Sequence, residues 1–412
     1  MMQIKQNTWR SWLVCIAAGL SMLYCFVQMT QFNALSHDVM TNLHLGFAKF
    51  SMLPSLYFLA NVIFLLPAGI LIDRFSKKNI LLISLVVSIV CLLIFSCWHN
   101  FIIFSLCSFV LGICGAFAFI TPLSLLANWF IHKKMALVSG IMITMGLFGA
   151  VISNAPLTYL INLIGWQDAL QFNALFGGLI FIITLLVVQD CPSGMTRVKS
   201  PLKLYGITQI IKNRQNWLFG SYASLINLVI MIFGAAFGIS YLKYVFHVTE
   251  SQAALSNSLL FIGAMIGPPI FGWLSDKLGK RKLPMYLGAV SSLIVMLILM
   301  CVTSLNLVLI DVLFFMLGVF TSAQVIAYPA ILESNSIVHG ALGLSICSTL
   351  IMAGAAIAIP LFGWLLDLHG IGGTIAHSAS DYKFALWVVP LAFVIGLILL
   401  FFGKETRCQQ AV

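Results

Sequence analysis

The sequence predicts an all-α membrane protein with twelve transmembrane helices, and three observations support this fold class. Hydrophobic residues make up 61% of the 412 residues, whereas charged residues make up only 8%. The mean hydropathy is +1.07, far above the value of soluble domains. Apolar runs long enough to cross a bilayer as a helix, about 20 residues each, recur from one end of the chain to the other.

Short polar connections divide the chain into twelve apolar segments. The expected spans are 11–34, 47–72, 79–98, 100–128, 135–161, 168–189, 216–243, 252–275, 284–303, 305–331, 338–366 and 384–403. The first run is read as a transmembrane helix and not as a cleaved signal peptide, because it is long enough to span and lacks a small-residue cleavage site. An even number of spans places both ends of the chain on the same side of the membrane.

Lys and Arg are distributed very unequally between the two sides that these spans define. Eighteen of the 21 basic residues fall on one side, and only Lys49, Lys243 and Lys383 fall on the other. Short loops rich in basic residues stay in the cytoplasm, so both termini and the central loop are expected there. The net charge of +10 therefore reports membrane topology, and no nucleic-acid partner is expected.

One long polar segment separates two groups of six spans. It covers residues 191–215, begins Cys191-Pro-Ser-Gly and includes a short interfacial helix expected near Ile207 to Lys212. The expected domains are thus an N-terminal six-helix bundle (1–190), a cytoplasmic linker (191–215) and a C-terminal six-helix bundle (216–412).

A short motif occurs once in each half. Gly69-Ile-Leu-Ile-Asp73-Arg74-Phe-Ser76-Lys-Lys78 and Gly272-Trp-Leu-Ser-Asp276-Lys277-Leu-Gly279-Lys-Arg281-Lys each end an apolar run and begin a basic turn. Their first glycines are 203 residues apart, which indicates two fused versions of one unit. A plain basic turn that only fixes topology is the alternative interpretation.

This motif resembles the loop between the second and third helices of each half in the major facilitator superfamily of solute carriers. The resemblance implies two pseudo-symmetric six-helix bundles that carry a solute by alternating access. It also implies that Asp73 docks on the helix start near 338–341, and Asp276 on the start near 134–136, which would close the inner gate. The gating residues implied in this way are Asp73, Arg74, Asp276, Lys277 and Arg281.

Other stretches resemble a bacterial subgroup, the phagosomal transporters of amino acids and nucleosides and their siderophore-handling relatives. They are Leu66-Pro67-Ala-Gly69, Ala127-Asn-Trp129-Phe130 and Ala155-Pro156-Leu157 with Gly165-Trp166. This likeness implies a monomer in the bacterial inner membrane, with both termini cytoplasmic.

Neutral polar side chains gather on the spans that border the cavity in this superfamily. Amides and phenols at membrane depth need partners, which a polar solute supplies, although hydrogen bonds between helices are the alternative for each residue. The candidate substrate-binding residues are Tyr24, Gln28, Gln31, Thr121, Asn154, Tyr222, Asn227, Gln324 and Tyr328.

Ionisable side chains at membrane depth are costly and are therefore candidates for function. The sequence offers Asp311 and Glu333 as sites of proton coupling, and no Lys or Arg near the middle of a span. A dianionic phosphate ester needs a cationic pocket, so we expect a small neutral or zwitterionic solute, of the amino acid or nucleoside type, coupled to H⁺.

The sequence also allows functions other than the transport of an amino acid or nucleoside. A metabolite, drug or siderophore carrier of the same superfamily remains open, and a non-transporting sensor is a weaker alternative. The chain has no Gly-x-x-x-x-Gly-Lys-(Ser/Thr) loop for ATP, and its eight histidines are scattered without metal-ligand spacing. We therefore expect no enzyme activity, no metal site and no cofactor.

Overall fold

The computed structural model describes residues 9–98, 100–130, 132–191, 211–302, 306–335, 340–369 and 379–408, and these ranges contain helices and no strand. In the first half the helices are α1 (Trp9–Asn42), α2 (Phe47–Arg74), α3 (Lys77–Cys97), α4 (Phe101–Trp129), α5 (His132–Ile152), α6 (Ala155–Ile164) and α7 (Trp166–Val187). In the second half they are α9 (Arg214–Val229), the π-helix η1 (Ile230–Phe237), α10 (Gly238–Phe246), α11 (Glu250–Leu278), α12 (Lys282–Cys301), α13 (Leu307–Thr321), the 3₁₀ helix η2 (Ser322–Ile326), α14 (Ala327–Glu333), α15 (Gly340–His369), α16 (Ala379–Leu386) and α17 (Val388–Phe402).

Twelve helical stretches of the described residues are long and apolar enough to cross a membrane, which confirms the predicted number. The helices extend beyond several predicted ends. For example, α1 continues to Asn42 and α15 to His369, whereas the apolar patterns end at 34 and 366. Hydropathy marks only the part of a helix that lies in hydrocarbon, and polar turns such as the one that holds His37 and Asp38 continue the helix outside it. Most of the expected linker helix lies outside the described residues.

Several spans are not regular α-helices. The fifth is interrupted at Asn154, because Pro156 in the first turn of α6 has no N–H to continue the ladder of α5. The seventh contains η1, the tenth contains η2, and the twelfth breaks at Trp387. Such π and 3₁₀ turns change the register of the side chains that follow them.

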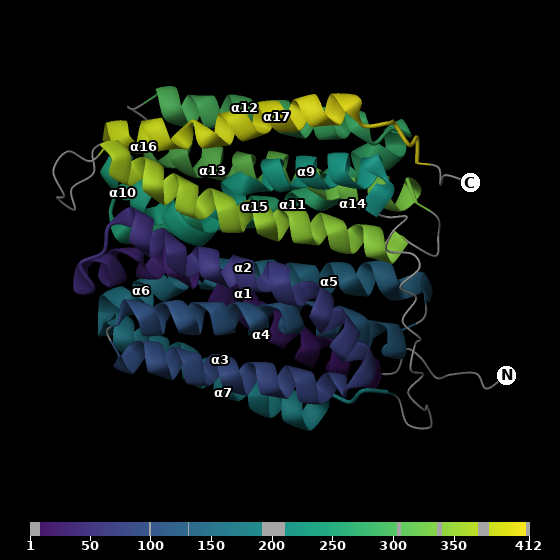
Figure 1. Cartoon of the computed structure of the whole chain (residues 1–412), viewed down its shortest axis with the longest axis horizontal. Coiled ribbons are helices and arrows are strands. Elements are labelled where there is room, and N and C mark those ends of the chain that lie inside the picture. Colours follow the sequence, from purple (N-terminus) through teal and green to yellow (C-terminus); the bar gives the residue numbers. More distant parts are fainter. Residues whose placement is uncertain are drawn as a thin grey trace. The chain divides into compact units, whose positions relative to one another are not determined.

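The chain forms two compact units, which Figure 1 colours from purple to yellow along the sequence. The first unit comprises Met1–Gln31 and Leu59–Leu202, and the second comprises Phe32–Phe58 and Lys203–Val412. Within the first unit α3 packs along α4 and α7, and within the second α11 packs along α13 and α9 along α15. The second unit therefore includes the end of α1 and the beginning of α2.

Glycines allow close backbone contact where α11 meets α13. A Cβ atom at Gly263 would lie 2.1 Å from the carbonyl oxygen of Phe315, and one at Gly318 would lie 2.0 Å from that of Leu260. Gly149 meets α1 in the same way, 2.1 Å from the carbonyl of Leu23. These small residues let helices approach in hydrocarbon, where packing takes the place of the hydrophobic effect.

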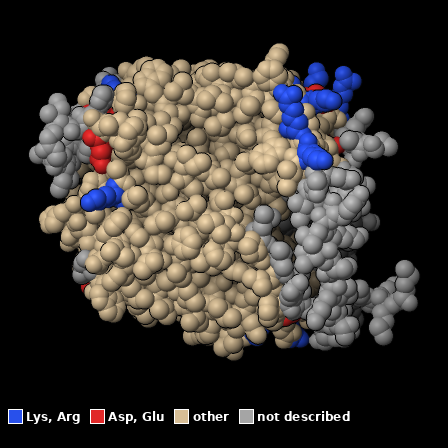
Figure 2. All heavy atoms as spheres, viewed as in Figure 1, with Lys and Arg blue, Asp and Glu red and all other residues tan. Residues whose placement is uncertain are grey.

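The surface between the helix ends is apolar. Leu175 of α7, Ile357 of α15 and Ile294 of α12 lie in the middle of their helices and expose 73%, 68% and 53% of their surface. Figure 2 shows that Lys, Arg, Asp and Glu on the visible face lie toward the helix ends, with an uncharged area between them. An exposed apolar belt bounded by charge fits a lipid environment.

Candidate functional site

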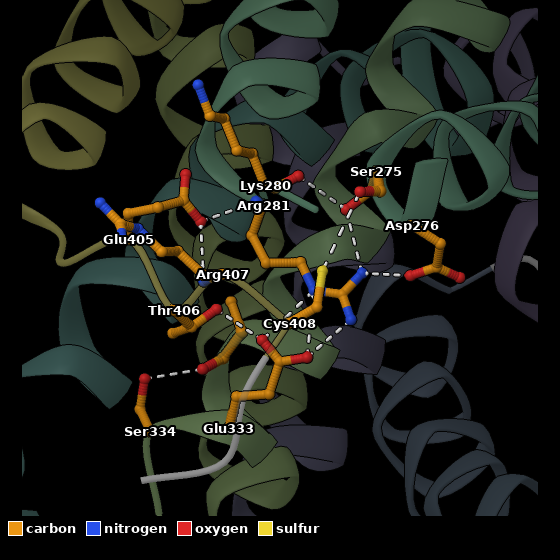
Figure 3. Close-up of polar contacts among 11 residues, drawn as sticks. Ser275, Asp276, Lys280, Arg281, Glu333, Ser334, Glu405, Thr406, Arg407 and Cys408 are labelled. Carbon is orange, nitrogen blue, oxygen red and sulfur yellow. Dashed lines mark hydrogen bonds and ion pairs between the residues drawn. The ribbon is translucent and has the colours of Figure 1, made fainter. Parts of the chain in front are cut away.

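The loop between α11 and α12 gathers charged side chains at one end of the second unit (Figure 3). Gly279 ends α11 with φ of +59°, a left-handed conformation that glycine adopts without steric cost. The loop then brings the side chain of Arg281 back alongside the last residues of α11. There its Nη1 donates to Ser275 Oγ at 3.0 Å and lies 2.7 Å from Asp276 Oδ1.

Arg281 has a second acidic partner, Glu333 at the end of α14. Its Nη2 lies 2.6 Å from Glu333 Oε1, and its Nε lies 3.1 Å and 3.2 Å from the two carboxylate oxygens. Burial alone would lower the pKa of Arg281, but hydrogen bonds to Glu333 and Asp276 outweigh it and raise this pKa above the ordinary value. The guanidinium therefore stays charged and holds the end of α14 against the loop.

The segment after α17 completes this cluster. Glu405 accepts hydrogen bonds from the backbone N–H groups of Arg281 (2.7 Å) and Lys282 (3.0 Å) at the start of α12, and Thr406 donates to Glu333. Burial opposes the charge on Glu405, yet these backbone donors lower its pKa. We call Ser275, Asp276, Arg281, Glu333, Glu405 and Thr406 the Arg281 cluster.

The predicted gating residues have different surroundings in the second unit. Arg281 is central to the cluster, whereas Asp276 joins it with a side chain that is 72% exposed. Lys277 lies apart, with its Nζ 4.7 Å from the centroid of the Trp273 ring. The expected partners of Asp276 near 134–136 have side chains outside the described set.

The corresponding loop of the first unit is anchored by its basic residues. The side chains of Asp73 and Arg74, and the expected partners near 338–341, are outside the described set. Lys77 Nζ donates to the carbonyl of Ser124, and Lys78 Nζ to that of Leu185, both at 2.6 Å. Ser76, which replaces the glycine of the second copy, caps α3 by accepting from the N–H of Asn79.

An amide cluster lies in the first unit between α1 and α7. Asn173 Oδ1 accepts from Gln28 Nε2 at 3.5 Å, and Asn173 Nδ2 donates to Gln31 Oε1 at 3.3 Å. Tyr24 donates to the backbone carbonyl of Asn173. Gln28 Oε1 and Gln31 Nε2 are buried and have no partner among the described residues.

A second amide pair lies within the second unit. Gln324 Nε2 of η2 donates to Asn227 Oδ1 of α9 at 3.2 Å, while Gln324 Oε1 is buried without a partner in the described part of the chain. Tyr328, one turn further, lies 3.5 Å from Ser348 Oγ of α15. Gln324 lies in the 3₁₀ helix η2 of the tenth span, which also holds Asp311 and Tyr328.

Two other predicted site residues, Tyr222 and Asn154, make contacts inside their own unit or helix. Tyr222 is fully buried and donates to the Met285 carbonyl of α12 at 2.7 Å, as Tyr241 does to the Leu299 carbonyl at 3.0 Å. Asn154 donates to the carbonyl of Ala150 at the break before α6. The buried Thr121 Oγ1 of α4 has no partner within the described ranges.

The two predicted proton-coupling residues differ in their partners. Asp311 of α13 accepts from Ser256 of α11. Glu333 is held by Arg281 and Thr406, as described above.

Three functional candidates escaped the sequence analysis: Asn33, Asn173 and Asp367. Asn173 is an amide in the apolar sixth span, two residues after Gln171, but that span was not expected to border a cavity. Asn33 and Asp367 lie at the limits of apolar runs and resembled surface residues. Their partners are backbone groups of distant helices, which no local pattern reveals.

The sequence also matches a known protein family and several of its members. The family described as the Major Facilitator Superfamily matches residues 17–239 and 218–410. A lysosomal dipeptide transporter of Danio rerio is 23% identical over 287 residues, 63% of this chain and 60% of that protein. The citrinin biosynthesis cluster transporter of Monascus ruber is 29% identical over 178 residues, 42% of this chain and 32% of that protein. The chain thus aligns with less than two-thirds of the length of either relative.

Solved structures show the same fold over nearly the whole chain. A bacterial homolog of the human lysosomal transporter Spinster superposes with a TM-score of 0.79 at 16% identity, covering 98% of both chains. The nucleoside transporter NupG gives 0.76 at 13% identity, covering 94% of this chain and 99% of that one. A D-xylose–proton symporter gives 0.75 at 14% identity, covering 97% and 99%.

Proposed function

Since the chain belongs to the Major Facilitator Superfamily and is a secondary transporter, we propose that it carries a small, polar, neutral or zwitterionic solute by alternating access, coupled to H⁺. The observation that carries this proposal is the pair of amide clusters, one in each unit. Each has a buried polar atom left without a partner among the described residues: Gln28 Oε1 and Gln31 Nε2 in the first unit, and Gln324 Oε1 in the second. A solute with hydroxyl or amide groups would satisfy them.

We base the expected charge of the cargo on where the basic residues lie in the sequence. Lys49, Lys243 and Lys383 lie at or near helix ends, far in sequence from Gln28, Asn173 and Gln324. Amides donate and accept hydrogen bonds without compensating a full charge, so they favour an uncharged or internally balanced solute over a phosphate ester.

Asp311 is our first choice for the proton site. Asp311 is half-buried in the second turn of α13, a membrane-spanning helix, and Ser256 of α11 is its described partner. Glu333 already serves Arg281 and Thr406, so its charge supports the Arg281 cluster. The likeness to the phagosomal transporters favours a bacterial inner membrane, and the 18 of 21 basic residues expected on the side of the termini favour cytoplasmic termini.

The test is uptake into proteoliposomes from a mixture of amino acids, nucleosides, small metabolites and phosphate esters. It compares an inward proton gradient with a collapsed gradient. Gradient-dependent accumulation of a neutral or zwitterionic solute supports the proposal, and selective accumulation of a phosphate ester contradicts it. Asp311→Asn should abolish the dependence on the gradient while exchange of labelled solute continues. Lack of accumulation in every case would favour export or siderophore transport.

Substitutions of the amides connect this activity to the site. Gln324→Leu should raise the KM for the solute roughly five- to tenfold, the effect of losing one hydrogen bond to an uncharged ligand. Asn42→Ala is the matched control, because that amide donates only to the Asp38 carbonyl of its own helix and is exposed. An unchanged KM in Gln324→Leu would remove this residue from the site.

A further inference from the structure

The end of the second unit opposite Arg214 and Phe402 contains a carboxylate docked on a helix start. We call this end the far end; it is where α10 ends and α16 begins (Figure 1). Asp367, near the end of α15, accepts from the backbone N–H of Phe47 at 3.1 Å and of Ala48 at 2.8 Å. These are the first two residues of α2, whose N–H groups have no partner within the helix.

The surroundings of Asp367 fit this contact closely. Gly46, just before α2, leaves room for the carboxylate: a Cβ atom there would lie 3.0 Å from Asp367 Oδ2. One turn back along α15, Gly363 leaves room for Ser51 of α2 in the same way. Further along, Ser55 Oγ donates to the Ala356 carbonyl at 2.6 Å. Side chains of α2 therefore follow α15 over more than two turns.

Within the second unit, the end of α1 is also held by hydrogen bonds to backbone groups. Asn33 is fully buried, and its Nδ2 donates to the carbonyls of Phe233 (2.7 Å) and Gly234 (3.1 Å) in η1. Its Oδ1 accepts from the N–H of Ile239 at 3.1 Å. Ser36 Oγ lies 3.1 Å from Ser240 Oγ one turn later. The carbonyl of Phe233 also accepts from the N–H of Gly238 within the π-helix, so Asn33 adds a second hydrogen bond to it.

We propose that Asp367 is a latch that holds the far end shut, and that its release from the start of α2 is required for solute to enter or leave there. This inference rests on the proposed alternating access. The beginning of α2 and the end of α1 belong to the second unit, while the remainder of both helices belongs to the first. Because α2 continues from the second unit into the first, the opening that we propose draws the start of α2 away from α15 and breaks the Asp367 contacts.

The latch uses the chemistry that the sequence analysis assigned to Asp73 and Asp276 at the other end. A carboxylate next to free N–H groups gains from the helix dipole and from two charge-assisted hydrogen bonds. Both hydrogen bonds described above run from backbone N–H groups to the Asp367 carboxylate. This suits a contact that forms and breaks in every transport cycle.

The test measures how fast a buried position at the far end becomes reachable from water. The probe is Ser240→Cys, which is 6% exposed, in a chain whose four cysteines that are not buried (Cys97, Cys191, Cys301 and Cys408) are changed to Ala. A membrane-impermeant maleimide is added to right-side-out and to inside-out vesicles. We expect Asp367→Ala to raise the labelling rate roughly fivefold in right-side-out vesicles, the effect of losing one helix-end carboxylate.

Two further variants make the result specific. Gly46→Ala should raise the rate in the same direction but less, because its methyl group displaces the carboxylate without removing it. Asp168→Ala removes an exposed carboxylate in the first turn of α7 and should leave the rate unchanged. Gel filtration and thermal midpoints check folding, and Gly46→Ala carries the test if Asp367→Ala does not fold.

Labelling of the folded Asp367→Ala variant, or of Gly46→Ala in its place, at the parent rate would overturn the latch. A rise confined to inside-out vesicles would support the latch and reverse the proposed topology. Labelling needs no solute, so failure of every uptake assay would count against the proposed cargo without affecting this result.

Discussion

Arg281 and Glu333 are joined by both the terminal and the Nε nitrogens of the guanidinium, at 2.6 Å to 3.2 Å. The same guanidinium reaches Asp276, but the two acids differ in burial: the side chain of Glu333 is 14% exposed and that of Asp276 is 72% exposed. Buried and exposed ion pairs differ greatly in their contribution to stability. Arg281 therefore has one structural partner and one that water readily replaces.

The first prediction concerns Arg281→Ala. It leaves Glu333 buried without its cation and should lower the free energy of unfolding by about 3 kcal/mol. The matched change, Asp276→Ala, removes an exposed pair and should lower it by less than about 1 kcal/mol. Thermal unfolding of the detergent-solubilised protein provides the measurement, and equal losses in the two variants would contradict the assignment.

The second prediction separates folding from gating at the same loop. Asp276→Asn should slow transport, because the resemblance to the superfamily implies a role for this residue in the inner gate. The thermal midpoint should stay close to that of the parent, because the side chain is exposed. Uptake in proteoliposomes and thermal unfolding are measured on the same preparation. Uptake at the parent rate would remove Asp276 from the mechanism.

The third prediction concerns pH and Glu405. The pKa of this carboxyl is lower in the folded protein than its ordinary value of 4.5. Its contribution to stability is therefore complete above the unfolded pKa and is lost as the pH falls through the folded pKa. The thermal midpoint of the parent should exceed that of Glu405→Gln at pH 7, and the two should converge toward pH 3. A difference that is constant over this range would show that the charge of Glu405 plays no part.

The fourth prediction concerns Asn33→Ala. It leaves two carbonyls of η1 and the N–H of Ile239 without their amide partner and should destabilise the protein by about 2 kcal/mol. Hydrogen exchange should quicken at Ile239 first, which mass spectrometry of a peptide spanning 230–245 would detect. Asn42→Ala, whose amide bonds only within α1, is the control. Unchanged exchange at Ile239 would show that η1 holds its shape without Asn33.

The fifth prediction distinguishes two residues that the sequence analysis placed in one group. Tyr222→Phe removes a hydroxyl that donates to the Met285 carbonyl, so it should lower stability by about 1 kcal/mol and leave the KM unchanged. Gln324→Leu should raise the KM and leave the stability unchanged. Paired measurements of thermal midpoint and KM decide the matter, and a raised KM in Tyr222→Phe would place its hydroxyl against the solute.

The sequence predicted the twelve helices because hydrocarbon imposes a minimum length and excludes charge, and both signals are local. It did not predict the breaks at η1, η2 and Trp387, because an apolar run has the same composition whether it forms an α, π or 3₁₀ turn. The break at Asn154 had a visible cause in Pro156, but span length alone favoured an unbroken helix.

The site was less predictable than the fold. Gln28, Gln31 and Gln324 stood out because an amide in an apolar run is rare and needs partners. Asn173 and Asp367 did not stand out, since the role of each depends on which helices pack together. The partnership of Arg281 with Glu333 and Glu405 joins positions 52 and 124 residues apart, and single-sequence spacing carries no trace of it.

The π-helix η1 also explains how the transmembrane segment made of α9, η1 and α10 contacts α12 at both of its ends. Tyr222 and Tyr241 are 19 residues apart, and in an uninterrupted α-helix this spacing would leave them about 100° apart around the axis. Each π turn holds about one residue more than an α turn and so takes up much of this difference. Both phenols then face α12, where they bind the carbonyls of Met285 and Leu299. Deletion of a single residue from η1 would make this spacing 18 residues, which is five full turns of a regular α-helix, so both tyrosines would still face α12 after the π turn is lost.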